Sequence, residues 1–208
     1  MFNIDDNTIK SLILKGHFGL EKESLRISDD GHIVHTPHQF IDNPRISRDF
    51  CENQTEINTD VCSGIDEVYE ELTDYTDTIW NTISADNELL WPFSNPPYII
   101  DESDIPIAQF YGSDRHKTEY REYLADKYGR FKMTFSGIHF NYSFADELLL
   151  YDYESHLPSD SRSNSNSSDQ SFTEYKNSFY LELAKQMSAY GWLIVCLTAA
   201  SPILDISF

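Results

Sequence analysis

The sequence predicts an α+β fold, because stretches with strand periodicity and stretches with helix periodicity can be told apart along its 208 residues. The segment 19–27, GLEKESLRI, alternates at strand spacing, and the aromatic-rich segment 131–144 is the strongest strand candidate. After Gly64, apolar residues recur at intervals of three, four and seven, as on one face of a helix. Separate strand and helix stretches favour a sheet flanked by helices.

The first part of the chain predicts a helix, a hairpin and a further strand. Residues 3–16 predict a short helix. In the hairpin that follows, one strand runs to Ile27, the turn contains Asp30 and Gly31, and the chain returns through HIVHT. A second strand is expected near 55–58, before the helix that starts after Gly64.

The second part of the chain predicts two helices separated by a strand and a polar loop. Three prolines within 92–97 end the preceding helix and force an extended loop. A helix is expected over 114–128, with Gly129 as its terminating residue. Residues 158–171 are rich in Ser, Asn and Asp and predict a flexible loop, and a long helix is expected over 173–199.

The composition restricts the possible partners. With 35 acidic and 15 basic residues the formal charge is −20, which argues against nucleic acid or an anionic membrane as main partner. An anionic substrate would need local cations or metal ions. The three cysteines, Cys51, Cys62 and Cys196, form no CxxC pair, so neither a disulfide framework nor a zinc site is expected. No signal-peptide pattern or membrane-length apolar run is visible, and a cytoplasmic protein is expected.

An unusual pair of acids marks the first strand. Glu21 and Glu23 share one strand face with the apolar residues Leu25 and Ile27. Two acids at this spacing lie about 7 Å apart, which suits two neighbouring metal ions better than one. In a chain with 35 acids, however, such a pair is more often a solvated strand face.

Further acids and one histidine could extend this face. The segment DFCENQTE carries Asp49, Glu52 and Glu56. His139 lies on a predicted strand face with Met133, Phe135 and Asn141. Asp49 and Glu56 are seven residues apart, so a shared site requires a bend between them. A lone histidine of this kind is more often half-buried and satisfied than a metal ligand. From composition and spacing alone, a Mg²⁺ site is therefore a hypothesis.

Five ordered motifs resemble the amino-terminal part of bacterial glutamate–cysteine ligase. These are GLEKESLRI, DFCENQTEINT, LWPFSNPPYI, YREYLADKYGRFKMTFSGIHFNYSF and AASPILDISF. The resemblance covers nearly the whole chain except 150–172, and it is closer to the ligase module of bifunctional glutathione synthase than to the stand-alone enzymes.

The resemblance implies a glutamine-synthetase-like core, in which a curved antiparallel sheet, flanked by helices, forms a partial funnel. The funnel would hold ATP with two or three Mg²⁺ ions. ATP would phosphorylate the γ-carboxylate of glutamate, and the amine of cysteine would then attack the acyl phosphate, in the first step of glutathione biosynthesis.

The resemblance also implies roles for individual residues. Glu21 and His139 would serve the ion nearer the nucleotide phosphates, and Glu23, Asp49 and Glu56 the ion that faces the glutamate carboxylate and the amine. Four residues are assigned to substrate binding: Tyr120, Leu124, Met133 and Phe135, of which the first two match positions that line the cysteine pocket. Stand-alone enzymes often carry a polar residue where this chain has Met133. Arg121 is a candidate catalytic anion clamp, because a guanidinium binds phosphate or carboxylate through two parallel hydrogen bonds.

Family members are more than twice as long as this chain. Residues 1–208 are therefore expected to be an apparently truncated amino-terminal portion of the catalytic domain, completed by a missing carboxy-terminal portion. Two other interpretations remain open: a related ligase with another amine acceptor, which Met133 allows, and a non-catalytic remnant that acts as a binding module.

Overall fold

The computed structural model describes residues 2–157 and 169–198. Of these residues, 18–142 form one compact unit, and 2–17, 143–157 and 169–198 belong to the other. The candidate site residues lie in the first of these, called the larger unit below.

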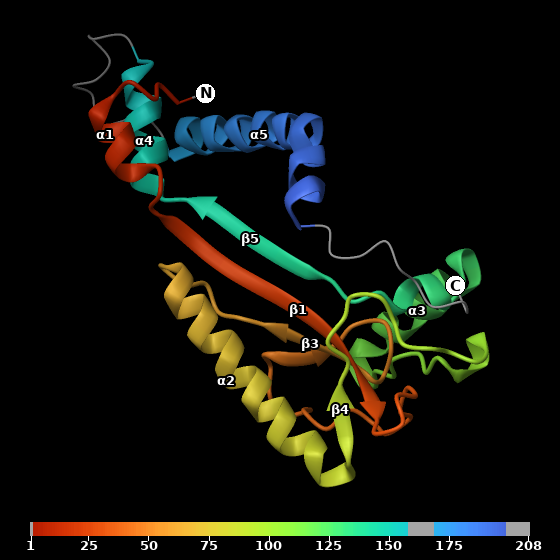
Figure 1. Cartoon of the computed structure of the whole chain (residues 1–208). Coiled ribbons are helices and arrows are strands. Elements are labelled where there is room, and N and C mark those ends of the chain that lie inside the picture. The colour runs from red at the N-terminus through yellow and green to blue at the C-terminus, as the bar shows by residue number, and fades with distance from the viewer. Residues whose placement is uncertain (1, 158–168, 199–208) are drawn as a thin grey trace. The chain divides into compact units, whose positions relative to one another are not determined.

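The larger unit is built on an open antiparallel sheet (Figure 1). Its long central strand β1 (Gly16–Ser28) pairs with β3 (Gln54–Asn58) and with β4 (Glu88–Leu90), and β2 (Ile46–Arg48) pairs with β3. The strand order is β2-β3-β1-β4, and β5 (Ile138–Phe144) pairs with β1 outside this path. Within the described residues the sheet does not close into a barrel. The expected α+β fold, an antiparallel sheet with helices, is confirmed.

Helix α2 (Ile65–Ile83) covers one face of the sheet. Asp66 and Glu67 in its first turn suit the positive end of the helix, and the Glu67 carboxylate accepts a hydrogen bond from the Ser63 backbone N–H. Ile79 and Ile83 are buried with residues of β2 and β3 in one core cluster, because the helical periodicity brings them to the same side. The predicted helix after Gly64 is thus confirmed.

A second core cluster joins β1 to the hairpin turn after β2 and to helix α3 (Arg115–Tyr128). Leu25, Phe50 and Cys51 are buried there. Gly129 terminates α3 with a positive φ of 80°, and a Cβ at this position would lie 2.9 Å from Glu102 Oε1. The expected end of this helix at a glycine is therefore confirmed, with a steric reason.

The described residues of the other unit form three helices: α1 (Asn7–Leu12), α4 (Asp146–Ser155) and α5 (Asp169–Thr198). Asp6 caps α1 by accepting hydrogen bonds from the backbone N–H groups of Thr8 and Ile9. Ile9 and Leu12 are buried with a leucine of α4. The helix expected over 3–16 is real but shorter, because the chain enters β1 at Gly16.

Three expectations need correction. The strand expected over 131–144 starts only at Ile138, and residues 131–134 form a short 3-10 helix. The hairpin turn at Gly31 forms with a φ of 87°, but the returning chain makes a single bridge between Ile27 and Ile33 rather than a strand. The long helix begins at residue 169 instead of 173, and the rest of the expected loop, 158–168, lies outside the described residues.

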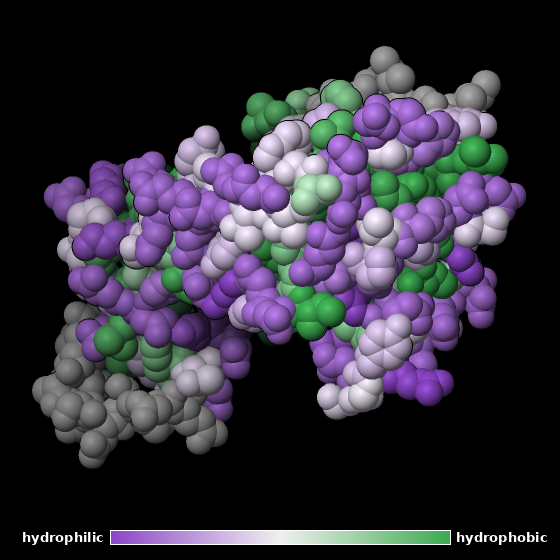
Figure 2. All heavy atoms as spheres, turned by 90° about the horizontal axis from the view of Figure 1, so that it is seen from below, coloured by the Kyte–Doolittle hydropathy of each residue, from purple (hydrophilic) through white to green (hydrophobic). Residues whose placement is uncertain are grey.

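The surface reflects the acidic composition. Figure 2 shows one face of the molecule, on which hydrophilic side chains predominate and hydrophobic ones are scattered among them. Among the described helices, none combines the length and the apolar character needed to cross a membrane.

Candidate active site

The pairing of three strands places acids in a row on one face of the sheet. Glu23 of β1 is directly opposite Glu56 of β3, and Glu56 is opposite Ser47 of β2. Side chains opposite each other in this way project to the same face, with Cβ atoms about 5 Å apart. The Ser47 hydroxyl donates a hydrogen bond of 2.8 Å to Glu56 Oε2, which fixes the orientation of that carboxylate.

A second group lies one step further along β1. His139 of β5 places Nδ1 3.1 Å from Glu21 Oε2 and Nε2 3.9 Å from Glu23 Oε1, so its ring lies between the two glutamates. Asn141, two residues on, donates a hydrogen bond of 2.9 Å to Glu21 Oε1. Since the imidazole is 59% exposed, it remains accessible from solvent.

Glu23 is the electrostatic centre of this face. Its side chain is only 9% exposed, and burial raises the pKa of its carboxyl above the ordinary value. The negative charges of Asp49 and Glu56 raise this pKa further, while the Gly137 N–H, 2.8 Å from Glu23 Oε2, and His139 lower it. Three carboxylates therefore act on one another with little cationic compensation.

The hairpin between β2 and β3 supplies the bend that the spacing of Asp49 and Glu56 requires. The Asp49 N–H donates to the Gln54 carbonyl, and Asp49, one residue past β2, lies near enough to Glu23 for its charge to raise the pKa of that carboxyl. The Gln54 side chain, fully buried, accepts from the Cys51 N–H and donates to the Phe135 carbonyl. This amide thus ties the turn that carries Asp49 to the segment that leads to Gly137.

Arg121 lies beside the acids, but its hydrogen bonds go to the backbone. Its Nε, Nη1 and Nη2 donate to the carbonyls of Asp49, Lys117 and Arg48, respectively. Burial lowers the pKa of the guanidinium, and the nearby Asp49 and Glu56 carboxylates oppose that effect. In this arrangement Arg121 anchors α3 to the hairpin turn, and its guanidinium contributes positive charge near Asp49.

The four residues assigned to substrate binding are divided between core and surface. Leu124 and Met133 pack against the cluster around Leu25, whereas Tyr120 and Phe135 are 59% and 39% exposed. Tyr120 and Leu124 lie four residues apart on α3, so they share a helix face. Met133 lies in the 3-10 helix and not on the strand with His139, contrary to the expected shared strand face.

The donors on this face fit Mg²⁺ in kind, because hard divalent cations prefer carboxylate oxygens. Burial is the main cause of the raised pKa of Glu23, and the charges of Asp49 and Glu56 add a repulsion that a bound cation would relieve. The spacing does not yet form a complete set of ligands: nowhere in residues 2–157 and 169–198 do three acidic, histidine or cysteine side chains lie close enough to hold one ion.

Sequence reasoning did not identify the partners that orient these acids. The acidic residues or their turn are contacted by Ser47, Gly137 and Gln54. These contacts depend on strand register and chain reversal, which the sequence does not display. The sequence pattern placed Asn141 on the strand face of His139, but its hydrogen bond to Glu21 depends on the pairing of β5 with β1.

The fold and the site together define the class of this protein. It is an α+β protein with an unclosed antiparallel sheet and a face of convergent carboxylates. The family model described as glutamate-cysteine ligase matches residues 1–208. The chain belongs to the glutamate–cysteine ligase family.

Curated relatives and solved structures agree with this family. The chain is 42% identical to a glutathione biosynthesis bifunctional protein GshAB of Listeria monocytogenes, covering 96% of this chain and 25% of the relative. It is 34% identical to a glutamate–cysteine ligase of Clostridium acetobutylicum, covering 98% of this chain and 41% of that protein. The crystal structure of a bifunctional glutathione synthetase from Pasteurella multocida matches with a TM-score of 0.80 and 30% identity, over 96% of this chain and 25% of that one. The chain thus spans about a quarter of the length of the bifunctional proteins it matches.

Proposed function

We propose that this chain is part of a cytoplasmic ATP- and Mg²⁺-dependent ligase that joins the γ-carboxylate of glutamate to the amine of cysteine. The reaction would pass through γ-glutamyl phosphate and would be the first step of glutathione biosynthesis. The observation that carries the proposal is the convergence of Glu23, Asp49 and Glu56 on one sheet face, in a chain of the glutamate–cysteine ligase family.

The acids would divide between two or three ions. Glu21 and His139 would hold the ion nearer the ATP phosphates, while Glu23, Asp49 and Glu56 would hold the ion that faces glutamate. Bound Mg²⁺ would supply positive charge to the transferring phosphoryl group and to the substrate carboxylate. The residues of this chain would fix those positions, with Ser47 and Asn141 orienting one carboxylate each.

Substrate positioning would fall mainly to α3 and the segment after it. Tyr120 and Leu124 would line the cysteine pocket together with Met133 and Phe135, and Arg121 would act as a clamp for phosphate or carboxylate. For Arg121 to do so, one or more of its bonds to backbone carbonyls would have to be exchanged for bonds to substrate. Its proximity to Asp49 supports a place at the edge of the site.

The relatives are longer than this chain, and this bears on whether the chain alone forms complete substrate pockets. Leu193 and Leu197 lie four residues apart on one side of α5 and are 43% and 84% exposed, and large apolar side chains exposed together commonly mark an interface. We propose that a carboxy-terminal portion, as in the longer relatives, covers this face and completes the substrate pockets.

The test is ADP release by the full-length protein. Release is expected to require glutamate, Mg²⁺ and cysteine together, and 2-aminobutyrate serves as an alternative amine. ADP formation at the same rate without any amine would contradict a ligase. Faster turnover with another amine than with cysteine would indicate a related ligase with a different acceptor, and no ADP formation under any condition would indicate a non-catalytic module.

A further inference from the structure

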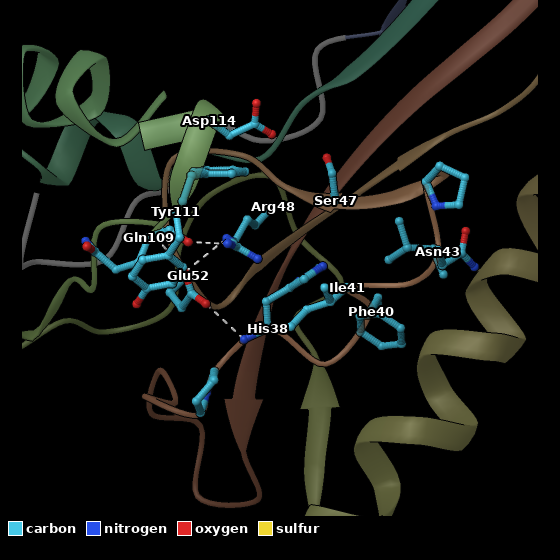
Figure 3. A pocket seen from close by; sticks show the side chains of 14 residues that line it. His38, Phe40, Ile41, Asn43, Ser47, Arg48, Glu52, Gln109, Tyr111 and Asp114 are labelled. Carbon is cyan, nitrogen blue, oxygen red and sulfur yellow. Dashed lines mark hydrogen bonds and ion pairs between the residues drawn. The ribbon is translucent and has the colours of Figure 1, made fainter. Parts of the chain in front are cut away.

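A cavity of about 480 Å³ lies beside β2 in the larger unit (Figure 3). Its walls come from two segments that are distant in the sequence, 37–52 and 109–114. A volume of this size is typical of small-molecule sites. None of the acids assigned to Mg²⁺ lines this cavity, although Ser47, which orients Glu56, belongs to its lining.

His38 gives this cavity an unused hydrogen-bond acceptor. The residue is 6% exposed, and its Nδ1 is buried without a hydrogen-bond partner among the described residues. A hydrogen bond with the Ile46 backbone occupies the other ring nitrogen, and burial, aided by the positive charge of Arg48, lowers the pKa of His38 to about 4. The ring is therefore neutral near pH 7, and Nδ1 accepts rather than donates. Buried acceptors are rarely left unpaired, so this nitrogen points to a missing donor.

The charged groups in the cavity neutralise each other. Arg48 Nε lies 3.1 Å from Glu52 Oε2, and the same carboxylate accepts hydrogen bonds from the backbone N–H groups of His38 and Gln109. Figure 3 shows Glu52 between His38 and Arg48, joined to both by these contacts. The other acid of the lining, Asp114, pairs with Lys117 at 3.0 Å. Because each charged side chain of the lining has a partner of opposite sign, a polyphosphate or a charged amino acid would find no unmatched counter-charge here.

The remaining walls are largely apolar. Phe40 and Ile46 are 6% and 1% exposed, and the aromatic side chains of Phe110 and Tyr111 contribute from the other segment. The guanidinium carbon of Arg48 lies 4.3 Å from the centre of the Phe110 ring, so that part of the wall is flat as well. Such walls suit a ring-shaped apolar body.

We propose that this cavity binds a neutral ring-containing small molecule that donates one N–H or O–H to His38 Nδ1 and packs its apolar body against Phe40 and Ile46. The acceptor sets the polar end of the ligand, the Arg48–Glu52 pair excludes a net charge, and the volume limits its size. The proposal does not depend on the ligase function.

The test compares benzamide with N,N-dimethylbenzamide, which keeps the ring and carbonyl but has no N–H donor. Isothermal titration calorimetry on the full-length protein is expected to show binding of benzamide about 3- to 10-fold tighter than of the dimethyl compound, the effect of one hydrogen bond. His38→Phe, which removes the acceptor and keeps an aromatic ring, is expected to abolish that preference. The matched control His35→Phe, at an exposed position, is expected to preserve it.

A crystal of the wild-type protein with benzamide provides a measurement that does not depend on the variant folding. The amide nitrogen is expected within hydrogen-bond distance of His38 Nδ1. The proposal is overturned if benzamide does not bind, if it binds elsewhere, if both amides bind equally well, or if His38→Phe leaves the preference unchanged.

Discussion

Two groups of charged side chains in the larger unit differ in whether the protein supplies their counter-charge. Arg26 and Glu88 are 0% and 3% exposed and paired at 2.8 Å, and the Thr36 hydroxyl donates to the same glutamate. Around Glu23, by contrast, the charges of Asp49 and Glu56 add to the burial that raises its pKa. One strand, β1, carries both Arg26 and Glu23. The first group is complete within the fold, whereas the second is incomplete, because neighbouring negative charges disfavour its central carboxylate.

Breaking the complete group should cost the most stability. Arg26→Met would leave Glu88 buried without its partner and would remove hydrogen bonds to the carbonyls of Thr36 and Glu52. The free energy of unfolding is expected to fall by about 3–5 kcal/mol, measured by urea denaturation.

The control for this prediction is an exposed ion pair. Arg45 and Asp60 are 39% and 51% exposed, so Arg45→Met should change the free energy of unfolding by less than about 1 kcal/mol. Equal losses of unfolding free energy in the two variants would show that burial does not make the Arg26–Glu88 pair more stabilising than the exposed pair.

Altering the incomplete group should affect activity and not the fold. Glu23→Gln keeps an oxygen that can accept from the Gly137 N–H and removes a charge that burial and two neighbouring acids disfavour. Turnover by the full-length protein is expected to fall at least about 100-fold, as when one group that stabilises transition-state charge is lost. The free energy of unfolding should stay the same or rise slightly.

The matched control for Glu23→Gln is Glu119→Gln on α3. Glu119 is 60% exposed and pairs with Arg115 of the same helix, so its removal should leave turnover unchanged. Wild-type turnover in Glu23→Gln would remove Glu23 from the proposed metal site, and a marked loss of stability would assign it a structural role instead.

A measurement of metal binding tests directly whether the group around Glu23 lacks a counter-charge. A cation that binds only the folded protein stabilises it by about 2.7 kcal/mol at a hundred times its dissociation constant. Mg²⁺ is therefore expected to raise the free energy of unfolding of the wild type, and a chelator should reverse the increase. The Glu23→Gln variant should respond much less. An equal response of both proteins would mean that the ion binds elsewhere.

Local periodicity accounts for the elements that sequence reasoning found. The helix after Gly64 and the end of α3 at Gly129 depend on side-chain spacing and backbone conformation within a few residues. The prediction of a strand was wrong for residues 131–134, because their alternating pattern reflects tertiary packing. Phe131 and Met133 contact the core around Leu25 from a 3-10 helix. Alternation alone does not distinguish a strand from such a turn.

The candidate site was accessible to the same reasoning only in part. Glu21 and Glu23 share a face by strand spacing, and His139 and Asn141 do so on β5. The proximity of Asp49 to Glu23 depends on a chain reversal between β2 and β3 and on strand register. Those long-range pairings produce no sequence pattern at a fixed spacing. Sequence reasoning therefore missed Ser47 and Gln54.

The smallest expected effect concerns a histidine near the complete group. Burial and the charges of Arg48 and Arg26 lower the pKa of His38 from 6.5 to about 4, against the opposing charge of Glu52. Between pH 6.5 and pH 4 the unfolded chain binds a proton on His38 that the folded protein does not, so stability falls as the pH falls through this window. Above pH 6.5 the neutral ring is favoured in both states and the contribution is complete.

Replacing this histidine should remove its part of the pH dependence. Between pH 7 and pH 5.5, the wild type is expected to lose roughly 1 kcal/mol more of its unfolding free energy than His38→Gln. Urea denaturation at both pH values measures the difference, and His35→Gln at an exposed position should retain the wild-type slope. If His38→Gln kept that slope as well, the ring would be protonated in the folded protein. The charges of Arg26 and Arg48 would then be balanced by Glu88 and Glu52 so fully that they do not disfavour the charged ring.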